Sequence, residues 1–197
     1  MIYNNVRHEC NLYNFFFAPR GNLRMMELGM KITQMYLNPF DRIIGIIGAQ
    51  DSGKSMLIKG MFPGIQTVDE DDEFEILNMP LLNAEDVGFY TPRTFHVDVR
   101  AARKYVPLET IAQAVLDVTA SKKRVIVEYF ELLYPVLKRN ADLLIGIGEE
   151  VLVTRPSLFG PLPDNIADIV FHSLIYRKMA HSAEDLFTYC VRDIERP

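Results

Sequence analysis

Hydrophobic residues along this chain fall into two kinds of segment, which predict strands and helices in alternation. Residues 43–47 and 125–127 form continuous runs of mainly β-branched residues, which is typical of strands buried on both faces. Further strands are predicted at 74–77, 94–99, 142–147 and 151–154. Helical spacing of apolar residues covers 22–37, 53–61, 108–119 and 132–139.

Strands that alternate with helices build βαβ units, so we expect an α/β protein with a mainly parallel central sheet and helices on both faces. A length of 197 residues suits a single domain spanning 1–197. Residues 1–21 are interpreted as an irregular N-terminal arm that docks its three consecutive phenylalanines on the core, and Asp164 as the N-cap of a C-terminal helical region over 164–194. The phenylalanines are Phe15, Phe16 and Phe17.

The strand at 43–47 leads into residues 48–55, Gly-Ala-Gln-Asp-Ser-Gly-Lys-Ser, which match G-x-x-x-x-G-K-[ST] at every fixed position. The predicted strand before the motif and the predicted helix after it provide the context that the motif requires. Its glycines let the backbone turn tightly, so that consecutive N–H groups point at phosphate oxygens beside the positive end of a helix dipole. The motif predicts a three-layer P-loop NTPase-like fold that binds ATP with Mg²⁺, with adenine assumed from its abundance.

Nine consecutive residues are therefore predicted to contact the nucleotide. Lys54 is expected to place its charge between the outer phosphates, and the Ser55 hydroxyl is expected to ligate Mg²⁺. The alternative is an ordinary glycine-containing turn with a solvated lysine. The nine residues are Gly48, Ala49, Gln50, Asp51, Ser52, Gly53, Lys54, Ser55 and Met56.

A carboxylate, Glu128, follows the second buried run directly. We expect it to face the loop from the end of its strand, where it would hold Mg²⁺ or orient an attacking nucleophile. Asp is the commoner residue at such a place. The alternative is an edge carboxylate paired with Arg124 or with a nearby lysine.

Two further segments supply candidates for the chemical step. Residues 69–73 are five consecutive acids, of which Asp69 or Asp71 is a candidate for accepting a proton from a substrate hydroxyl or for assisting the metal. Arg155 lies in a loop expected at the mouth of the sheet, where it would close over the transferring phosphate. The alternatives are a solvated acidic loop and a surface arginine that caps a strand.

His96, Asp98 and Arg100 alternate along a predicted strand and are therefore expected on one side of it. They would form either a polar wall of an acceptor pocket or the solvent face of an edge strand.

Three late residues, His172, His181 and Cys190, are spaced nine apart. On one helix this spacing turns neighbours in the series to opposite faces, so they are not predicted to share a metal ion. His181 and Asp185 could share a face, but two ligands do not make a zinc site.

Composition narrows the class of protein. The net charge of −5 argues against broad electrostatic binding to nucleic acid. No apolar run reaches the roughly 20 residues of a membrane span, and the N-terminus lacks a signal-peptide pattern, so a cytoplasmic protein is expected. The two cysteines form no CxxC pair, and the chain lacks the Asn-Lys-x-Asp signature of regulatory GTPases.

One resemblance extends over nearly the whole chain and rests on residues 17–21, 48–55, 61–64, 125–135, 146–150, 154–161 and 177–186. These stretches resemble a bacterial family, the alanine-tRNA synthetase second-additional-domain-containing proteins. The name implies kinship with tRNA-synthetase editing domains, which bind metal through His-x-x-x-His and Cys-x-x-x-His pairs. Here Asp185 occupies the position of the second histidine, four residues after His181, and Cys190 has no histidine at the matching position, so neither pair is intact. Deacylation of tRNA is therefore not implied.

The strand end at Glu128 is similar to the Val-Glu-Gly strand end of uridine-kinase-like enzymes, with Tyr129 in place of the glycine. Those enzymes use an acidic residue shortly after the first helix as the base for a nucleoside hydroxyl, and the acidic run at 69–73 follows the predicted helix at 53–61. The resemblance implies phosphoryl transfer.

Three functions are compatible with these features. The first is transfer of the γ-phosphoryl group of ATP to a small hydroxylated, nucleoside-like acceptor. The second is an ATP-hydrolysing switch that acts with a protein or tRNA partner, although the charge gives a tRNA partner no support. The third is a binding module whose nucleotide is structural.

Overall fold

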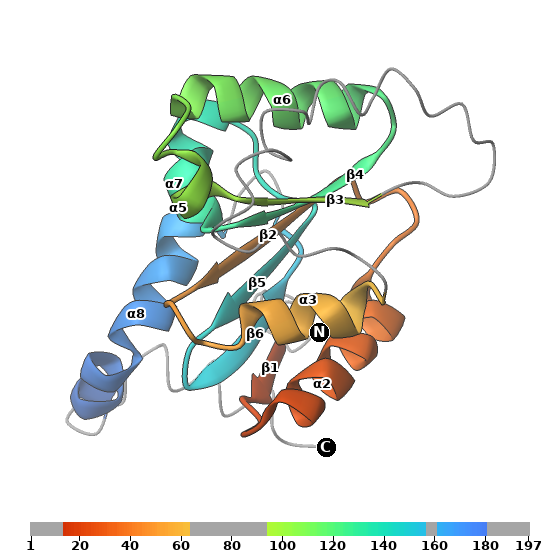
Figure 1. Ribbon diagram of the computed structural model, residues 1–197. Helices are drawn as coiled ribbons and strands as arrows, with labels where there is room; N and C mark the ends of the chain where they lie inside the picture. The colour runs from red at the N-terminus through yellow and green to blue at the C-terminus, as the bar shows by residue number, and fades with distance from the viewer. Residues whose placement is uncertain (1–13, 64–93, 157–160, 181–197) are drawn as a thin grey trace, which may run out of the picture.

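The computed structural model describes residues 14–63, 94–156 and 161–180, with side chains as far as Phe171. These residues form an α/β structure in which helices cover both faces of one six-stranded mixed sheet (Figure 1). Asp69, Asp71 and the strand predicted at 74–77 lie outside the described residues, as do residues 181–194 of the predicted C-terminal helical region. No helix among the described residues is long and apolar enough to cross a bilayer.

The strands are short, and their bounds agree with the sequence prediction within one residue wherever a strand was expected among the described residues. They are β1 Asn14–Phe17, β2 Ile43–Gly48, β3 Thr94–Asp98, β4 Arg124–Glu128, β5 Leu143–Ile147 and β6 Glu150–Thr154. Across the sheet the order is β1-β6-β5-β2-β4-β3. The strands β3, β4, β2 and β5 pair in parallel, whereas β6 is antiparallel to β5 and β1 is antiparallel to β6.

The helices are α2 Asn22–Tyr36, α3 Lys54–Met61, α5 Val99–Ala102, α6 Leu108–Ala120, α7 Phe130–Leu137 and α8 Pro163–Ala180. Side chains alternate across each strand, so the sheet supports two separate cores. Ile44 and Ile46 of β2 pack with α2 and α3, whereas Ile43 and Ile47 pack with α6, α7 and α8. Figure 1 shows α2 and α3 on one side of the sheet and α5, α6 and α7 on the other.

The N-terminal arm contains a strand that the sequence did not predict. Residues 14–17 pair with β6, where Asn14 is opposite Val153 and Phe17 is opposite Glu150. Phe15 and Phe16 pack against the two cores, but Phe17 is 80% exposed, so the prediction that all three phenylalanines dock on the core is wrong for Phe17. The pairing partner lies more than a hundred residues away, which explains why local pattern did not show the strand.

The chain leaves two neighbouring strands of the sheet toward opposite faces. The strands β2 and β4 are parallel neighbours, with Ile46 paired to Glu128. The chain leaves β2 into α3 on one face and leaves β4 into α7 on the other face. In open α/β sheets, ligands bind outside the carboxyl ends of strands where the connections diverge in this way. The carboxyl ends of β2 and β4 are therefore where a functional site is expected.

Candidate functional site

The loop between β2 and α3 depends on its two motif glycines. Gly53 precedes α3 with a φ of 92°, in the left-handed region that glycine adopts without strain. A β-carbon at Gly48 would lie 2.8 Å from the Ser52 hydroxyl and 3.0 Å from the Ile147 carbonyl oxygen. The backbone N–H of Ser52 donates to the Ala49 carbonyl at 3.3 Å, which closes the turn. The strand, loop and helix thus follow one another as the motif predicts.

Lys54, the first residue of α3, curls its side chain back over this loop. Its Nζ donates to the carbonyl oxygens of Ala49 at 2.6 Å and Gly48 at 3.3 Å, and to the Tyr129 hydroxyl at 3.2 Å. The ammonium also lies 4.3 Å from the centre of the Tyr129 ring. The lysine is 6% exposed, which contradicts the alternative of a solvated lysine on an ordinary turn.

Glu128, the last residue of β4, lies beside this lysine. Its Oε1 is 2.7 Å from His96 Nε2, and its Oε2 is 3.9 Å from Lys54 Nζ. All three side chains are buried, so the carboxylate is held between two potential cations away from bulk water. Glu128 therefore faces the loop, as predicted. Of the two partners in the alternative prediction, Arg124 is at the other end of β4 and donates to backbone carbonyls, whereas a lysine, Lys54 of the loop motif, does lie beside Glu128.

Tyr129 turns the chain from β4 into α7 in the left-handed conformation, with φ 55° and ψ 47°. A non-glycine residue in this conformation costs on the order of 1 kcal/mol, because its Cβ crowds the backbone. Tyr129 is 8% exposed. The Lys54 ammonium lies against its ring, and the Arg100 guanidinium carbon lies 5.7 Å from the ring centre. The strained turn thus aims an aromatic ring at the loop lysine.

The segment after β3 differs from the sequence prediction. His96 lies in the middle of β3 and Asp98 at its end, but Arg100 belongs to the short helix α5, so the three do not share a strand face. Asp98 caps α5 by accepting the Ala101 N–H at 2.9 Å. Burial raises the pKa of Asp98, and the charge of Glu128 raises it further, against the Ala101 hydrogen bond that lowers it. Arg100 reaches the loop, where its Nη1 donates to Gln50 Oε1 at 3.1 Å.

Glu131, in the first turn of α7, is a site residue that the sequence did not single out. Burial raises the pKa of its carboxyl to about 7, offset in part by its own backbone N–H and by the charge of Lys54. The charge of Asp164 acts in the opposite direction to that of Lys54 and raises this pKa. Its Oε2 is buried without a hydrogen-bond partner.

Unpartnered buried polar atoms concentrate at this edge of the sheet. Among the described residues, four buried side-chain polar atoms make no hydrogen bond, and three of them belong to Ser52, His96 and Glu131. The fourth, on Lys123, lies at the opposite end of β4. Buried polar atoms nearly always have partners in stable folds, so a cluster of exceptions favours a site that receives a polar ligand.

Arg155 does not belong to this site, and the prediction that it closes over a transferring phosphate is wrong. Because β6 is antiparallel, its last residue Thr154 pairs with Leu144, near the start of β5, at the edge opposite the loop. Arg155 there forms two bonds to the Asp41 carboxylate, at 2.6 and 2.9 Å. Burial would raise the pKa of Asp41, but these bonds and the Asn38 N–H lower it below its ordinary value.

The remaining predicted residues line the loop in different ways. Ala49, Gln50, Asp51 and Ser55 are exposed, whereas Met56 packs against the core between α2 and α3. No group of three or more His, Cys, Asp or Glu side chains in the described part of the chain is placed to hold a metal ion. The Ser55 hydroxyl and Glu128 Oε2 nevertheless provide the hard oxygen donors that Mg²⁺ accepts, together with phosphate oxygens, so these residues fit the ion.

In comparisons with known proteins, no family model and no curated protein matches this chain. Evidence for function therefore comes from the geometry at this edge of the sheet. The edge combines a tight glycine loop, a buried lysine, a buried carboxylate on the neighbouring strand and a set of unpartnered polar atoms.

Proposed function

We propose that this chain has a P-loop NTPase-like fold, binds ATP with Mg²⁺ at the 48–56 loop, and transfers the γ-phosphoryl group to a small hydroxylated, nucleoside-like acceptor. The observation that carries the proposal is the buried pair of Lys54, which follows the loop after β2, and Glu128, which ends the neighbouring strand β4, with Lys54 Nζ 3.9 Å from Glu128 Oε2. A cation and a carboxylate held at this point of an α/β sheet are suited to phosphates and their metal ion. The resemblance of the β4 end to uridine-kinase-like enzymes agrees with this proposal.

The loop would bind the phosphates through its backbone N–H groups and the N-terminal end of α3. Lys54 would exchange its bonds to the Gly48 and Ala49 carbonyls for bonds to phosphate oxygens, and so stabilise charge that develops during transfer. Ser55 and Glu128 would hold Mg²⁺, which neutralises phosphate charge when bound. His96 would keep Glu128 in position through the bond to its Oε1.

In the chemical step, an acceptor oxygen would form a bond to the γ-phosphorus while the bond from that phosphorus to the β–γ bridging oxygen breaks. ADP leaves with the electron pair of the broken bond, and the acceptor hydroxyl gives up its proton to a carboxylate. Asp69 or Asp71 remains our candidate for this carboxylate, on the basis of the sequence.

Release of ADP from ATP, measured with and without a panel of nucleosides, tests this proposal. We expect ADP release that depends on an acceptor, is abolished in Lys54→Ala and is retained in Lys59→Ala, which removes a lysine from the same helix. Hydrolysis without any acceptor would instead indicate the ATP-hydrolysing switch. If the parent and Lys54→Ala were equally inactive with every acceptor and with water, the proposal would be rejected.

The switch is the second candidate, and the observation that favours it is the length of α8. This helix covers 18 residues and extends past the edge of the sheet in Figure 1, where a protein partner or tRNA would reach it. Recovery of a partner only in the presence of a non-hydrolysable ATP analogue would support the switch, whereas recovery independent of nucleotide would count against it.

A further inference from the structure

We propose that Arg100 contacts the terminal phosphate of a bound nucleoside triphosphate and thereby makes the site prefer a triphosphate to a diphosphate. This inference rests on the nucleotide binding proposed above. It adds to the loop motif a cation from a separate element, and it replaces Arg155 in the role predicted from the sequence.

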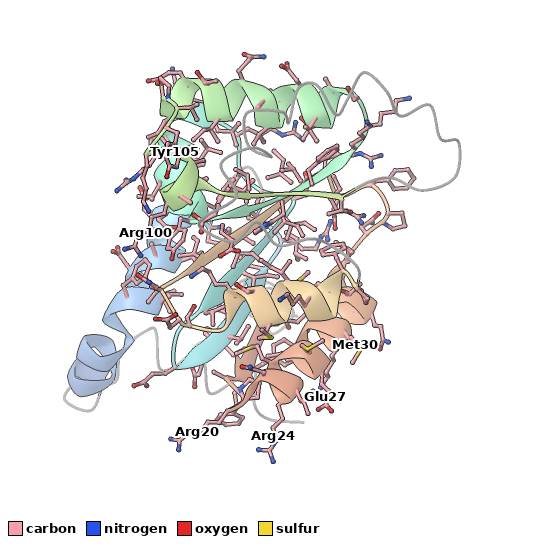
Figure 2. All side chains as sticks on the ribbon, viewed as in Figure 1. Arg20, Arg24, Glu27, Met30, Arg100 and Tyr105 are labelled. Carbon is pink, nitrogen blue, oxygen red and sulfur yellow. The ribbon has the colours of Figure 1, made fainter. Side chains whose placement is uncertain are left out.

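The sheet register brings Arg100 to the edge where the loop lies. Asp98, at the end of β3, pairs with Glu128 of β4, which in turn pairs with Ile46 of β2. The helix α5 begins at the next residue and is fixed by the Asp98 cap, so Arg100 stands two residues beyond the end of the strand. Figure 2 labels Arg100 at this edge, near the ends of β2 and β4.

Arg100 and Lys54 approach the same aromatic ring. The guanidinium carbon is 5.7 Å from the centre of the Tyr129 ring, and Lys54 Nζ is 4.3 Å from it. The two cationic centres are therefore no more than about 10 Å apart, a limit set by these two distances. The bond from Arg100 to Gln50 also ties the guanidinium to the exposed tip of the loop.

The two cations differ in burial, and we assign them to different phosphates for this reason. Lys54 is buried against the carbonyls of Gly48 and Ala49, whereas Arg100 is exposed and lies 5.7 Å from the centre of the Tyr129 ring. A diphosphate held in the loop would be within reach of Lys54, and a third phosphate would extend toward Arg100. A planar guanidinium donates two parallel hydrogen bonds to phosphate oxygens, which suits this terminal position.

Calorimetric titration of the full chain with ADP and with a non-hydrolysable ATP analogue, each with Mg²⁺, tests the proposal without relying on turnover. We expect Arg100→Ala to weaken binding of the ATP analogue by about 10- to 100-fold, the value of a charge-assisted hydrogen bond, and to leave ADP affinity within about threefold. Arg100→Lys, which keeps the charge but not the fork, should give an intermediate loss. Arg103→Ala, at the exposed end of the same short helix, should bind both nucleotides as the parent does.

Two results would overturn the inference. Equal weakening of ADP and ATP analogue by Arg100→Ala would mean that Arg100 only braces the loop through Gln50, and no effect on either nucleotide would mean that it is outside the site. If the parent bound neither nucleotide, the proposed nucleotide binding would fail together with this inference. If the parent bound both and only the Arg100 variants behaved as above, the inference alone would fail. Far-UV circular dichroism shows whether Arg100→Ala is folded; if it is not, the comparison of Arg100→Lys with the parent tests the inference.

Discussion

The buried carboxyl of Glu131 gives a prediction that depends on the structure alone. Its pKa is raised from an ordinary value of 4.5 to about 7, mainly because the carboxylate would lose water in the first turn of α7. Between these two values the folded protein keeps a proton that the unfolded chain has released. The free energy of unfolding must then fall as pH rises through this range.

The size of the effect follows from the shift. One pKa unit corresponds to 1.36 kcal/mol, so a rise from 4.5 to about 7 makes the ionised carboxyl cost about 3 kcal/mol above pH 7. Glu131→Gln keeps the shape of the side chain and has no charge to bury. Relative to the parent, this variant should gain about 3 kcal/mol of stability between pH 4.5 and pH 8.

Urea unfolding followed by far-UV circular dichroism at several pH values measures this difference, since the chain has no tryptophan to report by fluorescence. Glu109→Gln is the matched control, because Glu109 is also in the first turn of a helix but is exposed to water. A stability difference between Glu131→Gln and the parent that is the same at pH 5 and pH 8 would refute the reasoning, as would one that shrinks as pH rises.

Two further substitutions test the fold, one at the edge opposite the site and one in the loop itself. Arg155→Ala should lower the free energy of unfolding by about 2 kcal/mol in urea titrations, because it removes two hydrogen bonds from the buried Asp41. ADP affinity, measured by calorimetry, should stay unchanged. A loss of nucleotide affinity in a folded variant would contradict the position of Arg155 at the opposite edge. Gly53→Ala should lower the free energy of unfolding in the same urea titrations by about 1–2 kcal/mol. The φ of residue 53 is 92°, and the new methyl group would meet the Met25 side chain at 3.0 Å. An unchanged free energy of unfolding would show that the loop does not need this conformation.

The sequence predicted the central part of the fold because its signals are local. Continuous apolar runs identified β2 and β4, and the glycine-rich motif fixed where β2 ends and α3 begins. The β1 strand was missed because it forms by pairing with β6, which lies more than a hundred residues away in the sequence. The antiparallel direction of β6, by contrast, has a local signal that the prediction of a mainly parallel sheet did not use. Only two residues, Gly148 and Glu149, separate β5 from β6, and a parallel pair needs a connection of about a dozen residues.

Strand direction also explains the error at Arg155. A residue after a parallel strand would reach the edge that carries the loop, but β6 runs the other way and delivers Arg155 to Asp41. The prediction that Arg100 shares a strand face with His96 and Asp98 was wrong, because β3 ends at Asp98. That residue caps the helix α5, which begins at Val99 and contains Arg100. That helix brings Arg100 to Gln50, a contact that spacing along a strand does not predict.

The spacing of residues along the chain predicts neither the burial of Glu131 nor the contact between His96 and Glu128. Whether a carboxyl is buried depends on the elements packed around it, and Glu131 has no sequence feature that separates it from the exposed Glu109. The bond from His96 to Glu128 needs the β3–β4 register, which the sequence does not specify. The apolar run before Glu128 identified the carboxylate but not the group that holds it.

The most direct test of nucleotide binding is calorimetric titration of the parent, Lys54→Ala and Lys59→Ala with ATP and ADP in the presence of Mg²⁺. We expect saturable binding to one site in the parent and in Lys59→Ala. A folded Lys54→Ala variant should lose at least about tenfold in affinity, since the loop then lacks its buried cation. Absence of binding in the parent, or equal affinity in all three proteins, would contradict nucleotide binding at this loop.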